Sequence, residues 1–128
     1  MPGSLEDATA TFYAALNAVL GGDAGPMLDL WSHADDITYM SPFGEILSGW
    51  EPVGASWQSQ ADQRFGGEVH PEELHHFASA ELGFVVGFER GHVEIGGEHT
   101  PVNIRATSMY RVEDDRWAMV GHHTDPLG

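Results

Sequence analysis

The stretch DDITYMSPFGEILSGW, residues 35–50, decides the fold. It contains two short runs of strand-forming residues, Ile37–Ser41 and Glu45–Leu47. Between them, Pro42 presets the backbone for a turn and Gly44 tolerates angles that other residues avoid, so the two runs form a hairpin. A serine-capped helix is expected to begin near Gly49. The hairpin leaves a question open, namely whether Ser41 carries chemistry or only the bend.

Two helices are expected before this hairpin and one after it. Between residues 5 and 20, apolar side chains recur at helical spacing, with Ser4 as a suitable N-cap and Gly21-Gly22 as the end. Residues 23–32 are typical of a second, shorter helix. The helix that follows the hairpin is expected to end at Gly66-Gly67.

The rest of the chain is expected to form long strands over Pro71–Ser79, Leu82–Ile95, Thr100–Val112 and Arg116–Thr124. The order α-α-β-β-α-β-β-β-β predicts an α+β class. We expect a cone-shaped fold in which three N-terminal helices pack on a strongly curved, mainly antiparallel sheet. One domain is expected over residues 1–128. Such a sheet leaves a concave apolar cavity, which is the usual place for a small ligand.

The apolar residues of the longest central strand change parity along its length. They lie at even positions before Gly91, where Phe84 and Phe88 are assigned to the core, and at odd positions after it, as at Val93. A one-residue shift beside a glycine predicts a β-bulge at Gly91.

Composition excludes several functions. The chain of 128 residues has a net charge of −15, and its five basic residues are scattered arginines. Without a basic patch, nucleic acids and anionic membrane surfaces are excluded as partners. The absence of cysteine excludes disulfides, thiolate metal sites and a cysteine nucleophile. No apolar run is long enough to span a membrane and the start does not resemble a signal peptide, so a cytoplasmic protein is expected.

Three stretches together resemble the nuclear transport factor two-like superfamily, also called SnoaL-like or ketosteroid-isomerase-like. They are the hairpin and helix DDITYMSPFGEILSGWEPV, the paired strands around GGE, and the closing hairpin YRVEDDRWAMVGHHTD. The resemblance covers nearly the whole chain and implies the conical fold. It does not imply one function, because the superfamily includes isomerases, cyclases, dehydratases, epoxide hydrolases and non-catalytic domains.

Residue by residue, the resemblance argues against ketosteroid isomerase activity. In those enzymes an aspartate just before the hairpin turn is the base, and an acid on the penultimate strand binds the oxyanion. The matching positions here hold Ser41 and Ser108, and a serine hydroxyl is not a base near neutral pH. Epoxide hydrolases of this fold pair an arginine with acids, whereas Arg105 is followed two residues later by Thr107.

Histidine can supply the acid–base group that these serines cannot. Dehydratases of the fold use histidines with an aspartate, as the resemblance implies. Parity with Ser108 places His122 inward, whereas the recurrent histidine of the family matches His123 better, and the choice stays open. We take His122 and His76 as the candidate catalytic residues. Adjacent histidines point to opposite faces of a strand, so no metal site and no cofactor are predicted.

Two further sets of residues are assigned from these patterns. The expected ligand-binding residues are Tyr13, Tyr39, Ser41, Trp57 and Ser108. The closing strand is apolar on both faces, which indicates that its outer face is also covered. We therefore expect a homodimer interface on the convex side of the sheet, with Met109, Trp117, Met119 and His123.

Two functions remain open at this point. The first is binding of a small hydrophobic molecule in an apolar conical pocket, with proton transfer, isomerisation or dehydration as the chemistry. The second is a non-enzymatic oligomerisation or partner-binding module, whose pocket would be filled by side chains. The sequence does not decide whether the protein is an enzyme.

Overall fold

The computed structural model describes residues 3–127, so Met1, Pro2 and Gly128 of the expected domain lie outside the described residues. Its elements, in chain order, are α1 (Leu5–Leu20), α2 (Gly25–Leu30), β1 (Thr38–Met40), β2 (Ile46–Ser48), α3 (Trp50–Gln63), β3 (Gly67–Ala78), β4 (Leu82–Ile95), β5 (Glu98–Glu113) and β6 (Arg116–Pro126). This order confirms the predicted α+β class. Across residues 3–127, no helix has both the length and the apolarity needed to cross a bilayer.

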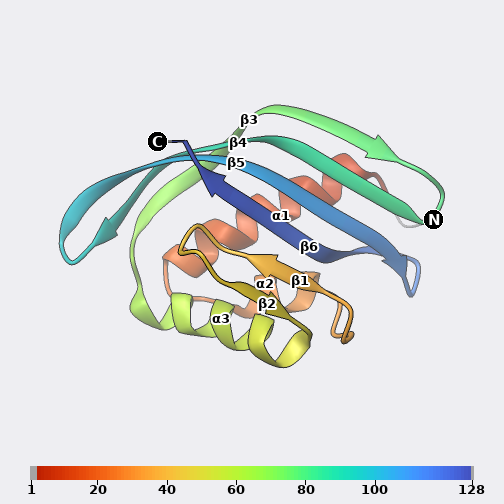
Figure 1. The fold of residues 1–128 in the computed structure, drawn as a ribbon, viewed down its shortest axis with the longest axis horizontal. Helices are drawn as coiled ribbons and strands as arrows, with labels where there is room; N and C mark the ends of the chain where they lie inside the picture. The colour runs from red at the N-terminus through yellow and green to blue at the C-terminus, as the bar shows by residue number, and fades with distance from the viewer. Residues whose placement is uncertain (1–2, 128) are drawn as a thin grey trace.

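The strands form one curved sheet that arches over the helices. Their order is β2-β1-β6-β5-β4-β3. Neighbours run antiparallel, except for the parallel pair β1 and β6. Figure 1 shows α1 beneath the arch, with α2, α3 and the β1–β2 hairpin further below. The helices therefore cover the concave face, and within residues 3–127 no helix covers the convex face.

Helix α1 connects the helical layer to the sheet. Ser4 Oγ accepts a hydrogen bond from the Asp7 N–H at 3.0 Å, as expected for an N-cap. Phe12 is fully buried at the centre of the core. Asn17 clamps the backbone of Val69, since its amide donates to the carbonyl and accepts from the N–H, both at 2.8 Å. These contacts fix α1 against the edge strand β3.

Two register shifts interrupt the sheet, and neither lies at Gly91. One is in β3 just before His75, and the other is in β6, where Val120 is the extra residue. Strand β4 pairs with β5 without interruption. Gly91 has φ 146°, and a Cβ there would lie 2.0 Å from the Glu68 carbonyl oxygen. The predicted bulge at Gly91 is therefore wrong, because the glycine serves close approach of β3.

Because β4 has no shift, its odd and even residues keep to opposite faces along its whole length. Val85 and Glu89 face the helices and are buried. Phe84 is 44% exposed on the convex face, where its ring stacks on Phe77 at 4.7 Å. Phe88 is half-buried beside a groove on that same face. The assignment of Phe84 and Phe88 to the core is wrong.

The extra residue Val120 reverses the faces of the first half of β6. Trp117 and Met119 lie opposite inward-facing residues of β5 and are only 8% and 0% exposed. Both belong to the hydrophobic core. Their predicted role in a dimer interface is wrong, because the bulge turns them toward the helices. Beyond the bulge, His122 returns to the face of Ser108.

An ion-pair network links the segment before β1 to the β5–β6 hairpin. Arg111 donates to both carboxylate oxygens of Asp36, at 2.8 and 3.0 Å, and to Glu113 Oε2 at 2.9 and 2.7 Å. The hydrogen bonds from Arg111 lower the pKa of Asp36. Burial alone would raise the pKa of Glu113, but hydrogen bonds from Arg111 and Ser32 outweigh it and lower that pKa.

Replacing Arg111 by methionine is expected to remove an acid-sensitive part of the stability. A carboxylate whose pKa is lowered by folding stabilises the native state above its unfolded pKa, and this contribution disappears as the pH falls through the folded pKa. Between about pH 5 and about pH 3, the unfolding free energy measured by urea denaturation should therefore fall more for wild type than for R111M. R64M, which removes an arginine outside the network, should follow wild type. Parallel curves for wild type and R111M would contradict the expectation.

Candidate functional site

A cavity of about 500 Å³ lies between the concave face of the sheet and the helices. Its wall is mostly apolar. The lining residues come mainly from α1, α3, the β1–β2 turn, the C-terminal parts of β4 and β6, and the N-terminal part of β5. The side chains that matter for chemistry among its lining residues are Tyr39, Trp57, Gln60, Glu89 and His122. The cavity is therefore open rather than filled by side chains, as a ligand site requires.

Four polar side chains form a continuous buried chain beside this cavity. Tyr13 donates its hydroxyl proton to Glu89 Oε2 at 2.9 Å. His122 Nε2 lies 3.1 Å from the same oxygen, and His122 Nδ1 lies 2.8 Å from Ser108 Oγ. Glu89, Ser108 and His122 are 4%, 4% and 2% exposed. Hydrogen bonds between buried polar groups fix the orientation of the side chains that make them.

The hydrogen bonds in this chain have one consistent direction when Glu89 is a carboxylate and His122 is neutral. Ser108 then donates to His122 Nδ1, and the Tyr13 hydroxyl donates to Glu89 Oε2. His122 Nε2 lies in ion-pair range of the same oxygen, at 3.1 Å. Burial and the neighbouring Glu89 raise the pKa of Tyr13, which keeps its hydroxyl protonated as a donor. The Nδ1 of His122 is therefore engaged by Ser108, and its Nε2 faces Glu89.

Glu89 has one oxygen left for a ligand. Its Oε2 accepts a hydrogen bond from Tyr13 and lies 3.1 Å from His122 Nε2. Its Oε1 has no hydrogen bond among residues 3–127 and is not one of the buried unpaired polar atoms of that range. Glu89 lines the cavity, so its carboxylate has an oxygen without a protein partner at the cavity wall.

Two aromatic side chains of the cavity wall carry hydrogen-bond donors. Tyr39 and Trp57 stack with ring centroids 4.6 Å apart. Gln60 donates to the Tyr39 hydroxyl at 3.1 Å, which leaves the Tyr39 proton available. Burial raises the pKa of Tyr39, so that proton is retained. The Trp57 Nε1–H has no partner among residues 3–127, but this atom is sealed from the cavity.

The structure brings together some of the residues expected from sequence and separates others. Ser41 accepts from the Phe43 N–H at 3.2 Å and donates to Glu45 at 2.8 Å, so its hydroxyl serves the turn. His76 contacts Thr9 at 3.2 Å, outside the cavity lining. His123 lies on the convex face, where its Nε2 is 2.8 Å from the Thr38 hydroxyl.

Sequence reasoning missed Glu89, the central residue of the site. The even-position phenylalanines of β4 predict a core-facing side, and Glu89, at an odd position, would then lie on the solvent side. A signal was available in the hairpin turn Gly96-Gly97: counting back from the pair Ile95 and Glu98 places Glu89 opposite Ile104. Ile104 belongs to the side of β5 that carries Ser108, so Glu89 shares that side.

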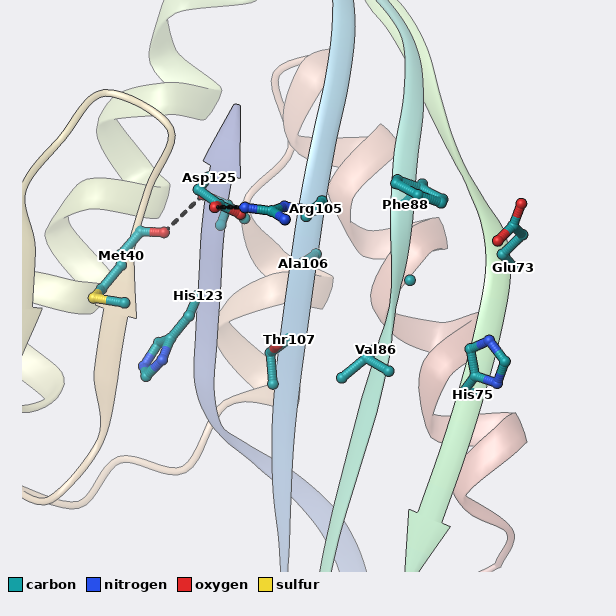
Figure 2. A pocket seen from close by; sticks show the side chains of 12 residues that line it. Met40, Glu73, His75, Val86, Phe88, Arg105, Ala106, Thr107, His123 and Asp125 are labelled. Carbon is teal, nitrogen blue, oxygen red and sulfur yellow. Dashed lines mark hydrogen bonds and ion pairs between the residues drawn. The ribbon is translucent and has the colours of Figure 1, made fainter. Parts of the chain in front are cut away.

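A second hollow, of about 580 Å³, lies on the convex face. Figure 2 shows its side chains pointing away from the helices, which lie behind the sheet. Val86, Phe88 and Met40 give it apolar walls, and Arg105 with Asp125 forms an ion pair at its end. His123 also lines this hollow and not the cavity of Glu89.

Comparison with known proteins gives a consistent family assignment. A family model described as a SnoaL-like domain matches residues 7–125. A candidate calcium/calmodulin-dependent protein kinase type II association domain from Thiobacillus denitrificans is 32% identical, with a TM-score of 0.73 over 98% of this chain and 96% of that chain. No curated protein matches the sequence significantly.

Two more distant structures share the fold. A candidate dehydratase of the NTF2-like family from Streptomyces avermitilis is 19% identical, with a TM-score of 0.84 over 97% of this chain and 94% of that chain. A candidate ketosteroid isomerase from Shewanella frigidimarina is 13% identical, with a TM-score of 0.73 over 93% and 92% of the two chains. At these identities the likeness concerns the fold alone.

Proposed function

Because this chain belongs to the SnoaL-like domain family, and because its cavity reaches a buried carboxylate–imidazole pair, we propose that it binds a small hydrophobic molecule and catalyses proton transfer on it. The observation that carries the proposal is the position of Glu89. Its carboxylate lines the cavity, is held by Tyr13 and His122 through Oε2, and keeps Oε1 free. A positioned carboxylate of this kind is a suitable general base.

The reaction that fits this arrangement is proton abstraction next to a carbonyl group. Glu89 Oε1 accepts the proton from carbon, and the electron pair of the broken C–H bond moves onto the carbonyl oxygen. A hydrogen bond from the Tyr39 hydroxyl stabilises that oxyanion. Return of the proton to another carbon completes an isomerisation. Its transfer to a departing β-hydroxyl group releases water and completes a dehydration, and neither route uses a cofactor.

The cavity wall and the charge of the chain restrict the substrate. The wall is mainly apolar, and its volume of about 500 Å³ suits a molecule of one to a few fused rings. The net charge of −15 repels anions. A neutral cyclic ketone or hydroxyketone is therefore the class that we expect.

Deuterium exchange tests this proposal before the natural substrate is known. The chain is incubated in D₂O with a panel of neutral ketones, such as cyclohexanone, 2-decalone and a 3-ketosteroid, and deuterium at the α-carbon is followed by mass spectrometry. Exchange faster than in buffer for at least one ketone supports the proposal. Exchange at the buffer rate for every ketone that binds in a thermal-shift assay contradicts it and favours a binding module.

Assembly is the second candidate function, and the convex face supports it. Phe77, Leu82 and Phe84 are 49%, 58% and 44% exposed there, which is unusual for one side of a sheet in an isolated chain. The relative from Thiobacillus denitrificans is named for association. Homodimerisation through this face is compatible with an open cavity on the other face, so the two functions do not exclude each other.

Replacing Phe84 by aspartate is expected to disrupt this homodimer. A charge at the centre of the exposed apolar strip would be desolvated by a second copy, which is costly. Light scattering at micromolar concentration should give twice the chain mass of 13.9 kDa for wild type and the single mass for F84D. F43D, at a residue that is 61% exposed in the β1–β2 turn, should stay dimeric. A monomeric wild type would refute the interface.

A further inference from the structure

We propose that the tip of the β4–β5 hairpin binds a divalent transition-metal ion through His92, Glu94 and His99. This site lies apart from the cavity of Glu89 and is independent of the proposed proton transfer. The three side chains each offer one ligand atom, and these atoms all lie within 4.8 Å of one another. Two imidazoles and one carboxylate form a donor set that zinc uses in proteins.

The strand register explains why these residues converge. His92 and Glu94 are two residues apart on β4 and so share a face. Glu94 lies directly opposite His99 on β5, because the turn at Gly96-Gly97 sets that pairing. The positions belong to a paired ladder and not to an irregular loop. A regular hairpin therefore supplies ligands from both of its strands.

The present geometry is close to that of a metal site. Glu94 Oε1 lies 4.0 Å from His92 Nε2 and 3.7 Å from His99 Nδ1. Metal–ligand bonds of about 2.0 Å in a tetrahedral site place ligand atoms about 3.3 Å apart. The two imidazole rings stack at 4.4 Å and an interplanar angle of 16°, so small side-chain rotations bring the nitrogens to one point. A water molecule can take the fourth position.

Electrostatics favours a cation at this place. Residues 91–100 contain no arginine or lysine, and the whole chain carries a net charge of −15. The imidazole ligands favour zinc, copper or nickel over magnesium or calcium, which prefer oxygen ligands. The cluster is open to solvent, with side-chain exposures of 35% for His92 and 66% for His99, so an ion can enter directly.

The opposite face of the same hairpin lines the cavity. Val93 and Ile95 alternate with the three ligands and point into the cavity wall. An ion that joins β4 to β5 at the tip restricts the separation of the two strands. Because the ion binds the folded hairpin and not the unfolded chain, metal binding is expected to raise the melting temperature of the chain by mass action.

Calorimetry with the untagged, chelator-treated full chain tests the site, with ZnCl₂ as the probe. We expect one zinc per chain and at least about a tenfold loss of affinity in each of H92A, E94Q and H99A. H75A, which removes an exposed histidine elsewhere on the convex face, should bind zinc as wild type does. Zinc should raise the melting temperature of wild type and H75A but not of H99A.

Several results would overturn the assignment. These are an absence of zinc binding in wild type, unchanged affinity in H92A and H99A, one zinc per two chains, and magnesium binding as tight as zinc. The substituted side chains are on the surface, so circular dichroism should show an unchanged fold in every variant.

Discussion

Replacing Glu89 by glutamine is expected to lower the rate of deuterium incorporation into a bound ketone by about 10²- to 10⁴-fold. Glutamine keeps the shape of the side chain and can still accept a hydrogen bond from Tyr13 and His122. It cannot accept a proton from carbon at neutral pH. The substitution therefore removes the base while the buried polar chain and the fold stay in place.

The matched control is Glu72→Gln on the convex face, where Glu72 lies 2.9 Å from His70 and 3.4 Å from Arg90. E72Q should exchange deuterium at the wild-type rate, and the thermal-shift response of E89Q to the same ketone should persist. An E89Q variant that exchanges as fast as wild type would remove Glu89 from the scheme.

His122 has a different expected role from Glu89, and its variants separate the two. We propose that His122 orients Glu89, because its Nδ1 is hydrogen-bonded to Ser108 and its Nε2 lies 3.1 Å from Glu89 Oε2. His122→Gln should reduce the maximal exchange rate less than E89Q does, with a similar ketone concentration at half-maximal rate. If H122Q loses as much activity as E89Q, the proton passes through the imidazole instead.

Replacing Phe12 by alanine is expected to cost about 3–5 kcal/mol of unfolding free energy. Phe12 is 0% exposed, and its ring lies 4.5 Å from His122 and 4.9 Å from Tyr13, centroid to centroid. Alanine would leave a cavity beside the buried polar chain. The surrounding helices and sheet would prevent this cavity from collapsing. Urea unfolding followed by tryptophan fluorescence measures the loss.

Phe43→Ala provides the control for this measurement. Phe43 is 61% exposed in the β1–β2 turn, and its removal should change the unfolding free energy by no more than about 0.5 kcal/mol. Similar losses for F12A and F43A would show that α1 is not the centre of the core. The comparison also matters for the site, because Phe12 supports the ring of His122.

Much of the fold followed from local patterns. The helical spacing of residues 5–20, the Ser4 cap and the Pro42–Gly44 turn each depend on neighbours along the chain, and the structure contains each of them. A hairpin turn also joins β4 to β5 at the GGE stretch, although only Gly96-Gly97 form the turn and Glu98 already belongs to β5. Such features are encoded by short-range sterics and capping, which a sequence displays directly.

The side of the sheet to which each strand residue points is harder to predict from sequence. A shift of one residue moves every following side chain to the opposite face. The apolar pattern of β4 predicted a bulge at Gly91, whereas the extra residues lie in β3 and at Val120 of β6. Phe84 is apolar and yet lies on the outer face, where the exposed strip supports the proposed homodimer. Trp117, in contrast, is apolar and packs in the core.

By itself, the sequence determined the order of helices and strands, the hairpin around Ser41 and the absence of a carboxylate at that position. Only the tertiary structure decided which group takes that place in the cavity. It brings Glu89 of β4 to His122 of β6 and to Tyr13 of α1, three residues that are remote along the chain. Their meeting depends on bulge positions and strand register, which arise from packing of the whole sheet against α1.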